Sequence, residues 1–286
     1  MLERAYVEIG NICNLTCSFC HGTKRARRQM SIEEFTLVLE GLRGRVKYLY
    51  LHVLGEPLLH PYLDSFLDIA NSFGFRVCIT TNGTLLGRSR DMLLRHTDVL
   101  HKVSVSLHAP EGSGIEDRLY SYIDGVCSAC KSLSEAGVYS VLRLWNADST
   151  DAVGKNDCNA LIEELLHSRF KEEWQSRRRG YRLARNIFLE YDGVFVWPAD
   201  SEAEPRECGF CHGLTQQIGI LADGSVVPCC LDAEGDMTLG NIFESSLEEI
   251  LTSPRAAAMR SGLAKGVFTE PLCRSCTYSR RFSGKD

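Results

Sequence analysis

The cysteines of this chain are the residues whose spacing could do chemistry. The sequence contains 13 cysteines, and Cys13, Cys17 and Cys20 follow one another as C-x3-C-x2-C. Thiolates are soft ligands for iron–sulfur clusters, and three of them from one short loop can hold one corner of an iron–sulfur cube. The remaining iron of such a cube would have no protein ligand from this motif and could bind a small molecule. A zinc site, or simply reactive thiols, is the alternative that the spacing leaves open.

A second cysteine group lies in the last third of the chain. Its members are Cys208, Cys211, Cys229, Cys230, Cys273 and Cys276. Cys208-x2-Cys211 and Cys273-x2-Cys276 together would make a credible four-cysteine zinc site. We interpret Cys230, which directly follows Cys229, as a bystander.

Composition narrows the classes of protein that this chain can belong to. The 286 residues are 44% hydrophobic and 24% charged, with a formal net charge of −5. That balance is typical of a folded globular protein, and the negative charge argues against general nucleic-acid binding. The sequence has no run of about 18 apolar residues for a membrane helix and no secretory signal. Without export, the cysteines are better explained as ligands in a reducing cytoplasm than as disulfides.

Alternating strand-like and helix-like segments must position the first cysteine group. Strands are expected over residues 5–9, 46–53, 75–80, 103–108, 138–145 and 187–196. Helices are expected over residues 31–42, 62–73, 88–96, 120–136 and 159–170. Such βα repetition predicts an α/β fold with a parallel sheet, curled into a partial barrel or left open, with helices outside. A ligand would then lie at the carboxyl ends of the strands.

The character of the chain changes near residue 198. Residues 198–205 are acidic and contain proline, as in a linker or loop, and they precede a hairpin expected at 218–227 and one helix at 246–251. We therefore divide the chain into a core domain, 1–197, and a small cysteine-rich domain, 198–286. The second domain has too few apolar residues for a core of its own, which predicts that bound metal stabilises it.

The first cysteine motif resembles the signature of radical S-adenosylmethionine (SAM) enzymes. Phe19, directly before Cys20, matches the aromatic residue that packs near the adenine in that family. Residues 54–57, Leu-Gly-Glu-Pro, are similar to the family's Gly-Gly-Glu-Pro segment, which holds the methionine amino group, although Leu54 replaces the first glycine. Residues 80–83, Thr-Thr-Asn-Gly, also end the third strand as in many members.

The resemblance continues along the later strands and covers roughly residues 5–196. Ser106 occupies a fourth-strand position where a serine often contacts the ribose, and Arg143 on the fifth strand resembles a carboxylate-binding position. The resemblance implies a partial (β/α)6 barrel and a 4Fe–4S cluster bound by Cys13, Cys17 and Cys20. The SAM-binding residues that it implies are Phe19, Gly55, Glu56, Pro57, Asn82, Ser106 and Arg143.

The same resemblance implies an activity. The reduced cluster would cleave SAM to methionine and a 5′-deoxyadenosyl radical, which abstracts hydrogen from a peptide or small-molecule substrate. An electron donor such as flavodoxin or ferredoxin would be a partner. Glu190 and Asp232 are candidates for a proton acceptor or a quencher of the product radical, whereas His52 and His108 are expected to be satisfied core histidines. Because the first strand begins near residue 5, we expect no leader-binding domain before it.

The second cysteine group resembles the C-terminal extension called SPASM or, in its shorter form, twitch. Cys211 is followed by Gly224 and Cys229 at the family's spacing, and the chain ends ten residues after Cys276. That length favours the short form with one auxiliary cluster. The ligands that it implies for a second 4Fe–4S cluster are Cys211, Cys229, Cys273 and Cys276. Cys208 in place of Cys211 remains open.

A hypothesis of another class is a non-catalytic zinc or iron–sulfur binding module, with RNA as a conceivable ligand. Two basic runs motivate it, Lys24–Arg28 and Arg177–Arg185. We expect the first run to be a solvated loop and the second a solvated helix and loop. The Gly55-Glu56-Pro57 segment and the ordered βα units argue against this hypothesis, since a simple binding module needs neither.

Overall fold

A single curved sheet forms the centre of the molecule. The computed structural model describes residues 2–109, 118–146, 157–193 and 196–282. In these ranges the sheet has 11 strands, in the order β11-β10-β9-β1-β2-β3-β4-β5-β8-β7-β6. The strands are β1 (Arg4–Val7), β2 (Tyr48–Leu51), β3 (Arg76–Thr81), β4 (Leu100–Ser106), β5 (Tyr139–Leu144), β6 (Gln175–Arg177), β7 (Gly180–Ala184), β8 (Ile187–Tyr191), β9 (Gln217–Ile220), β10 (Ser225–Val227) and β11 (Gly240–Asn241).

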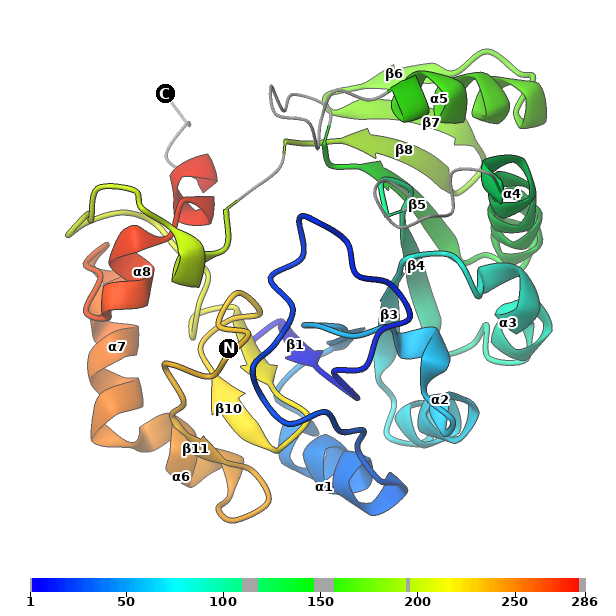
Figure 1. Cartoon of the computed structure of the whole chain (residues 1–286). Helices are drawn as coiled ribbons and strands as arrows, with labels where there is room; N and C mark the ends of the chain where they lie inside the picture. The colour runs from blue at the N-terminus through cyan, green and yellow to red at the C-terminus, as the bar shows by residue number, and fades with distance from the viewer. Residues whose placement is uncertain (1, 110–117, 147–156, 194–195, 283–286) are drawn as a thin grey trace.

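Strands β1, β2, β3, β4, β5 and β8 pair in parallel, one after another, and form the predicted partial barrel. The helices between them are α1 (Ile32–Leu42), α2 (Leu63–Ser72), α3 (Leu86–Leu94), α4 (Leu119–Glu135) and α5 (Asp157–Arg169). They lie on the outer side of the sheet (Figure 1). These strands and helices confirm the predicted α/β class, with their ends shifted by a few residues. No helix in the described ranges has both the length and the apolar character needed to cross a bilayer.

Alternation along the strands separates an outer apolar face from an inner polar face. In β1, Ala5 and Val7 are fully buried in the core beneath the helices. Tyr6 and its cross-strand partner Tyr50 point to the other side, where their rings lie 5.1 Å apart. Since side chains alternate across a strand, the polar residues of β1 to β5 line the inside of the barrel.

The C-terminal part of the chain continues the sheet of the core domain. β9 pairs in parallel with β1, and β9 and β10 form the predicted hairpin. Ile218 and Ile220 of β9 are fully buried in the main hydrophobic cluster. The apolar residues of this region therefore share the core of the barrel, whereas the sequence predicted a separate unit that depends on metal.

The C-terminal part also has more helix than expected. Besides α6 (Leu247–Thr252), which matches the predicted helix, the structure contains α7 (Pro254–Ala264) and α8 (Pro271–Ser275). The prediction of one helix was wrong because α7 buries only Ala256, Met259 and Leu263, a stripe too sparse to stand out in the sequence.

The second basic run is part of a β-hairpin and not of a helix. β6 and β7 pair antiparallel at one edge of the sheet, and β7 pairs with β8. The Arg177 guanidinium lies 4.9 Å from the Phe188 ring centroid, and Arg179 is 3.4 Å from the Asp192 carboxylate. β8 ends at Tyr191, earlier than the predicted strand 187–196, of which residues 194 and 195 lie outside the described ranges.

Candidate functional site

The loop between β1 and α1 carries the first cysteine group. Cys13 and Cys20 are exposed and Cys17 is half-buried. The backbone N–H of Leu15 lies 3.5 Å from the Cys13 sulfur, and that of Gly22 lies 3.4 Å from the Cys20 sulfur. Burial, and then the neighbouring Cys20 and Cys13, raise the pKa of the Cys17 thiol to about 12. Such thiols ionise together only when a cation offsets their charge, so this donor set fits a metal cluster.

A buried ion pair fixes the far end of this loop. Glu8 at the end of β1 is fully buried and accepts two hydrogen bonds from the Arg25 guanidinium, at 2.9 and 2.7 Å. Arg25 Nε also donates to the backbone carbonyl of Ala233 at 2.8 Å. The expectation that the first basic run is only solvated was therefore wrong for Arg25, because its charge neutralises a carboxylate in the interior.

The segment after β2 packs directly on the start of the cysteine loop. Gly55 has a φ of 77°, and a Cβ at this position would lie 2.3 Å from the Gly10 carbonyl oxygen. The backbone N–H of Glu56 donates to the Ile12 carbonyl at 2.9 Å. Both the conformation and the close approach require glycine at position 55. Pro57, also buried, begins the short helix η1 (Pro57–Leu59).

The Glu56 carboxylate joins this segment to the end of β3. It is 4% exposed and accepts hydrogen bonds from the Thr81 hydroxyl and the Asn82 backbone N–H, both at 2.7 Å, and from the Leu58 N–H at 3.0 Å. Burial raises the pKa of Glu56, while these donors oppose the shift. The Asn82 amide donates to Asn14 at 3.0 Å and lies 3.7 Å from the Cys13 sulfur. This network holds the first cysteine against the third strand.

A cavity of about 500 Å³ opens inside the barrel, above the inner face of the sheet. Phe19, Ser106 and Arg143 line it, whereas Gly55, Glu56, Pro57 and Asn82 do not belong to its walls. The Phe19 ring lies 4.8 Å from the His108 ring, whose Nδ1 is 3.1 Å from the Arg143 carbonyl oxygen. His108 thus has the partner that the sequence analysis expected.

Arg143 combines a stacked guanidinium with an unused donor. Its guanidinium lies 4.4 Å from the Trp145 ring centroid, and its buried Nε has no hydrogen-bond partner among the described residues. Burial lowers the pKa of Arg143, with Glu190 acting in the opposite direction. A guanidinium placed in this way is suited to bind a carboxylate.

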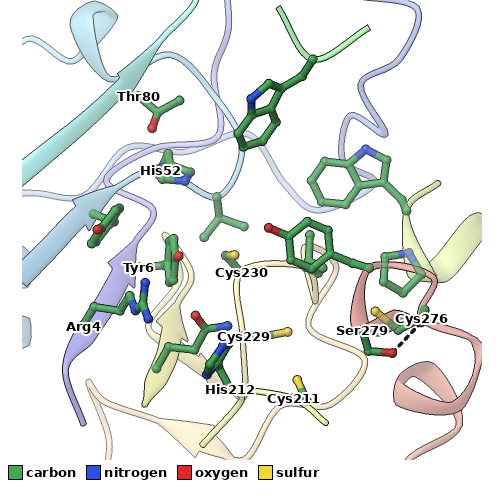
Figure 2. A pocket seen from close by; sticks show the side chains of 18 of the residues that line it. Arg4, Tyr6, His52, Thr80, Cys211, His212, Cys229, Cys230, Cys276 and Ser279 are labelled. Carbon is green, nitrogen blue, oxygen red and sulfur yellow. Dashed lines mark hydrogen bonds between the residues drawn. The ribbon is translucent and has the colours of Figure 1, made fainter. Parts of the chain in front are cut away.

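Five cysteines of the C-terminal region line the opposite wall of the same cavity. They are the four predicted ligands, Cys211, Cys229, Cys273 and Cys276, and also Cys230, which was interpreted as a bystander. Figure 2 shows the sulfurs of Cys211, Cys229 and Cys276 facing one region between the hairpin and the C-terminal helices. Burial, then Cys211 and Cys276, raise the pKa of the Cys273 thiol to about 12. These half-buried thiols, like those of the first group, repel one another as thiolates and therefore fit a shared metal centre.

Cys208 does not belong to this wall. It is exposed, and its backbone forms a bridge with Val267 away from the cavity. Among the described residues, no three His, Cys, Asp or Glu side chains converge closely enough for one metal ion. The structure therefore separates Cys208 from Cys211, which lies on the cavity wall.

The other predicted residues lie outside the cavity. Asp232 is 1% exposed, and its carboxylate accepts the Asp236 and Met237 backbone N–H groups, both at 2.9 Å. Burial raises the pKa of Asp232 to about 6. Glu190 is exposed on β8, opposite Arg143 in register. Neither carboxylate is among the described residues that line the cavity.

Several polar residues on the cavity floor were not predicted as site residues from the sequence. Arg4, Tyr6, Tyr50 and Lys102 line it from β1, β2 and β4. The signal was present in the alternation of polar and apolar residues along these strands. His52 also lines the cavity, with an Nδ1 that has no hydrogen-bond partner among the described residues, so the expectation of a satisfied core histidine was wrong. Burial, then Arg143 and Lys102, lower the pKa of His52 to about 3.

Comparison with known protein families gives two matches, one for each part of the chain. The model of the radical SAM superfamily matches residues 7–145. The model of SPASM, an iron–sulfur cluster-binding domain, matches residues 211–277. The two matched segments contain the first cysteine group and the five C-terminal cysteines of the cavity wall, respectively.

Three individual proteins illustrate the similarity. The antilisterial bacteriocin subtilosin biosynthesis protein AlbA of Bacillus subtilis is 23% identical over 273 residues, and this chain spans 59% of its length. The probable GTP 3′,8-cyclase of Sulfurisphaera tokodaii is 31% identical over 300 residues, which cover 90% of each chain. The crystal structure of Streptococcus suis SuiB bound to precursor peptide SuiA has a TM-score of 0.58 at 15% identity and covers the whole of this chain and 74% of SuiB.

Proposed function

The chain belongs to the radical SAM superfamily and carries a SPASM domain, and we propose that it abstracts a hydrogen atom from a peptide or small-molecule substrate. Its cofactors are SAM, a 4Fe–4S cluster of the core domain and auxiliary iron–sulfur in the C-terminal domain. When bound, the reduced cluster and SAM supply a 5′-deoxyadenosyl radical. The chain's own task is to hold these groups, orient the substrate and exclude water.

One observation carries this proposal. Cys20, from the first cysteine group, and the four proposed C-terminal ligands open onto the same cavity, together with Cys230, Phe19 and Ser106. A radical generated at one wall would therefore meet its substrate in a space whose opposite wall holds the auxiliary centre. The apolar and aromatic lining protects such a species from solvent.

We assign Cys13, Cys17 and Cys20 as ligands of the SAM-binding cluster. Support comes from the backbone N–H groups directed at two of the sulfurs and from the network that joins Asn82 to Cys13. Gly55, Glu56 and Pro57 act through the backbone that they hold against the loop.

Residues on the cavity wall would bind the rest of SAM. The unused donor of Arg143 suits the methionine carboxylate, Ser106 suits the ribose, and Phe19 offers a ring face near the adenine. Each of these three side chains is thus paired with one chemical group of SAM.

The auxiliary cluster in this proposal is a single 4Fe–4S centre bound by Cys211, Cys229, Cys273 and Cys276. The convergence of these residues on one wall, away from Cys208, supports the set. We also propose a core domain, 1–197, and a cluster-binding domain, 198–286. One continuous sheet joins the two domains. A cytoplasmic location and reduction by flavodoxin or ferredoxin complete the proposal.

Both substrate classes have relatives that motivate them. AlbA is named as a bacteriocin biosynthesis protein, and SuiB was crystallised with a precursor peptide. The Sulfurisphaera relative is named as a probable GTP cyclase, which indicates a small molecule.

The test is anaerobic reconstitution followed by a count of iron, sulfide and zinc per chain, and by an assay for 5′-deoxyadenosine. About eight irons and 5′-deoxyadenosine formation under reducing conditions are expected. About four irons with one zinc would replace the auxiliary cluster by a structural site. Zinc alone, with no cleavage of SAM and tight RNA binding, would support the non-catalytic binding module instead.

A further inference from the structure

Two cations lie at the floor of the cavity, on the inner face of the sheet. In register, Tyr6 of β1 lies beside Tyr50 of β2, Tyr50 beside Cys78 of β3, and Cys78 beside Lys102 of β4. The Lys102 ammonium is 5.3 Å from the Tyr50 ring centroid. Arg4 enters the same region from the start of β1, near Tyr6 (Figure 2), and its charge lowers the pKa of Tyr50 against the effect of burial.

Protein carboxylates do not neutralise these charges inside the cavity. The described residues that line the cavity include Arg4, Lys102 and Arg143. They include no Asp or Glu. Arg4 has an ion pair with Glu3 at 3.2 Å on the exposed side, while its buried Nε has no hydrogen-bond partner in the described ranges. Lys102 forms no ion pair with any described residue, and burial lowers its pKa. Arg4 and Lys102 are half-buried, and cations partly withdrawn from water gain from an anionic partner, so a ligand with negative charge would be bound there.

The proposed cofactors leave this charge in place. SAM has one carboxylate against an ammonium and a sulfonium, and we have assigned that carboxylate to Arg143. Lys102 lies four residues before Ser106 on β4, roughly 13 Å away at the rise of an extended strand. The ribose position therefore lies well above the floor of the cavity.

The auxiliary cluster accounts for Arg4 at most. Arg4 lies close enough to Cys230 and His212 to affect their pKa values, so it could offset cluster charge. Lys102 interacts electrostatically with Cys78, Arg143, Glu190 and Arg4, and with none of the proposed ligand cysteines. Glu190 acts on Lys102 only from a distance, since the two form no ion pair and Glu190 does not line the cavity, so a cluster leaves Lys102 without a directly paired anion among the described residues.

We infer that Arg4 and Lys102 form a subsite for an anionic oxygen group of the substrate, a phosphate or a carboxylate. The inference rests on the proposed function for the identity of the cavity as the substrate site. It adds that the substrate enters with its anionic group on the floor of the barrel and its reacting carbon nearer Ser106. The aromatic rings of Tyr6 and Tyr50 then flank the bound anion and its attachment.

The test is a calorimetric titration of the reconstituted, SAM-bound holoenzyme with two probes, inorganic pyrophosphate and glutarate. Binding of at least one probe is expected, and it should weaken about tenfold in Arg4→Gln and in Lys102→Gln, the loss of one charge-assisted contact. Lys102→Arg keeps the charge and should retain most of the affinity. Arg88→Gln and Lys171→Gln remove exposed cations and should leave binding unchanged.

Each outcome decides the matter. Binding of pyrophosphate alone identifies a phosphate group, and binding of glutarate alone identifies a carboxylate. Absence of binding to the wild-type protein, or equal affinities in Arg4→Gln and Lys102→Gln, overturns the inference. The inference is also overturned if Arg4→Gln and Lys102→Gln change only the reduction potential of the auxiliary cluster and not the binding of the probes. Should Lys102→Gln fail to fold, the pair Arg4→Gln and Lys102→Arg still gives a decision.

The titration is independent of turnover, which separates the two proposals. If the wild-type protein binds the probe but forms no 5′-deoxyadenosine, the proposed function fails and the anion subsite stands. If it forms 5′-deoxyadenosine and binds neither probe, the subsite fails and the proposed function stands.

Discussion

Glu8 and Arg25 form a two-pronged ion pair that ties the end of the first strand to the far end of the cysteine loop. The same carboxylate also accepts the backbone N–H groups of Leu54 at 3.3 Å and Ala222 at 3.0 Å. One fully buried side chain therefore joins β1, the cysteine loop, the segment after β2 and the C-terminal hairpin. Loss of this charge would disturb both cysteine groups at once.

We expect Glu8→Gln to destabilise the fold by about 3–5 kcal/mol, because Arg25 would remain as a largely buried cation without its partner. Chemical unfolding of the apoprotein measures the change. Arg45→Gln is the control, since it breaks the exposed Arg45–Glu248 pair and should cost about 1 kcal/mol or less. Equal effects of the two variants would contradict a structural role for the buried pair.

Gly55→Ala tests the contact between the Gly-Glu-Pro segment and the cysteine loop. The new Cβ would meet the Gly10 carbonyl oxygen at 2.3 Å, so the two segments must separate. We expect loss of iron from the first cluster together with a lower melting temperature.

Gly44→Ala is the matched control for that experiment. Gly44 has a φ of 72°, close to the 77° of Gly55, but nothing lies within 4 Å of its added Cβ. It carries only the conformational strain, about 1 kcal/mol, and should keep its iron. Iron loss from Gly44→Ala as well would mean that strain, and not the close approach, explains the effect.

Comparing Cys211→Ala with Cys208→Ala tests which of the two cysteines is a ligand of the auxiliary cluster. Of these two, Cys211 lies on the cavity wall and Cys208 does not. Cys211→Ala should therefore lose about four irons per chain, while Cys208→Ala keeps the full iron content. Iron analysis and the electron paramagnetic resonance of the reduced protein give the result. Iron loss from Cys208→Ala alone would transfer the ligand role to that residue.

Within the first group, the triple variant Cys13→Ala, Cys17→Ala and Cys20→Ala should form no 5′-deoxyadenosine at all. Cys273→Ala with Cys276→Ala should lose the auxiliary iron and still cleave SAM without turnover of substrate. Product analysis by liquid chromatography measures both. Full cleavage by the triple variant is incompatible with the proposed mechanism.

His52 should make the protein sensitive to acid. Its pKa is about 3 in the folded state, against about 6.5 when unfolded, so the unfolded chain binds more protons between these values. Stability is therefore fully present above pH 6.5 and falls as the pH drops toward 3.

Unfolding free energies at pH 7 and pH 5 measure this effect. His52→Gln should show a smaller loss between the two pH values than the wild type, because it removes one group that must be protonated. An unchanged loss in His52→Gln would show that His52 titrates normally.

Local patterns in the sequence account for most of the barrel. In the structure Ser31 and Glu34 form a capping box at the start of α1, a pattern that depends on residues three positions apart, and apolar alternation is typical of the parallel strands. The spacing of Cys13, Cys17 and Cys20 identified the loop that bears the chemistry. These signals depend on residues that are close together in the chain.

Contacts between distant residues could not be predicted in the same way. The pairing of Arg4 with Gln217 in register, and the contact of Glu8 with Ala222, join opposite ends of the chain. Arg4 and Lys102 lay just outside the predicted strands 5–9 and 103–108, and only the curvature of the sheet brings them to one floor. The β6–β7 hairpin was missed because its strands are short, exposed and rich in arginine.

The parallel pairing of β1 with β9 also sets an order of assembly during synthesis. The first strand leaves the ribosome more than two hundred residues before the strand that covers its free edge. Until then β1 has an unpaired edge, and Arg25 lacks the Ala233 carbonyl. The loop that carries Cys13, Cys17 and Cys20 therefore gains this anchor only after residue 233 has been added to the chain.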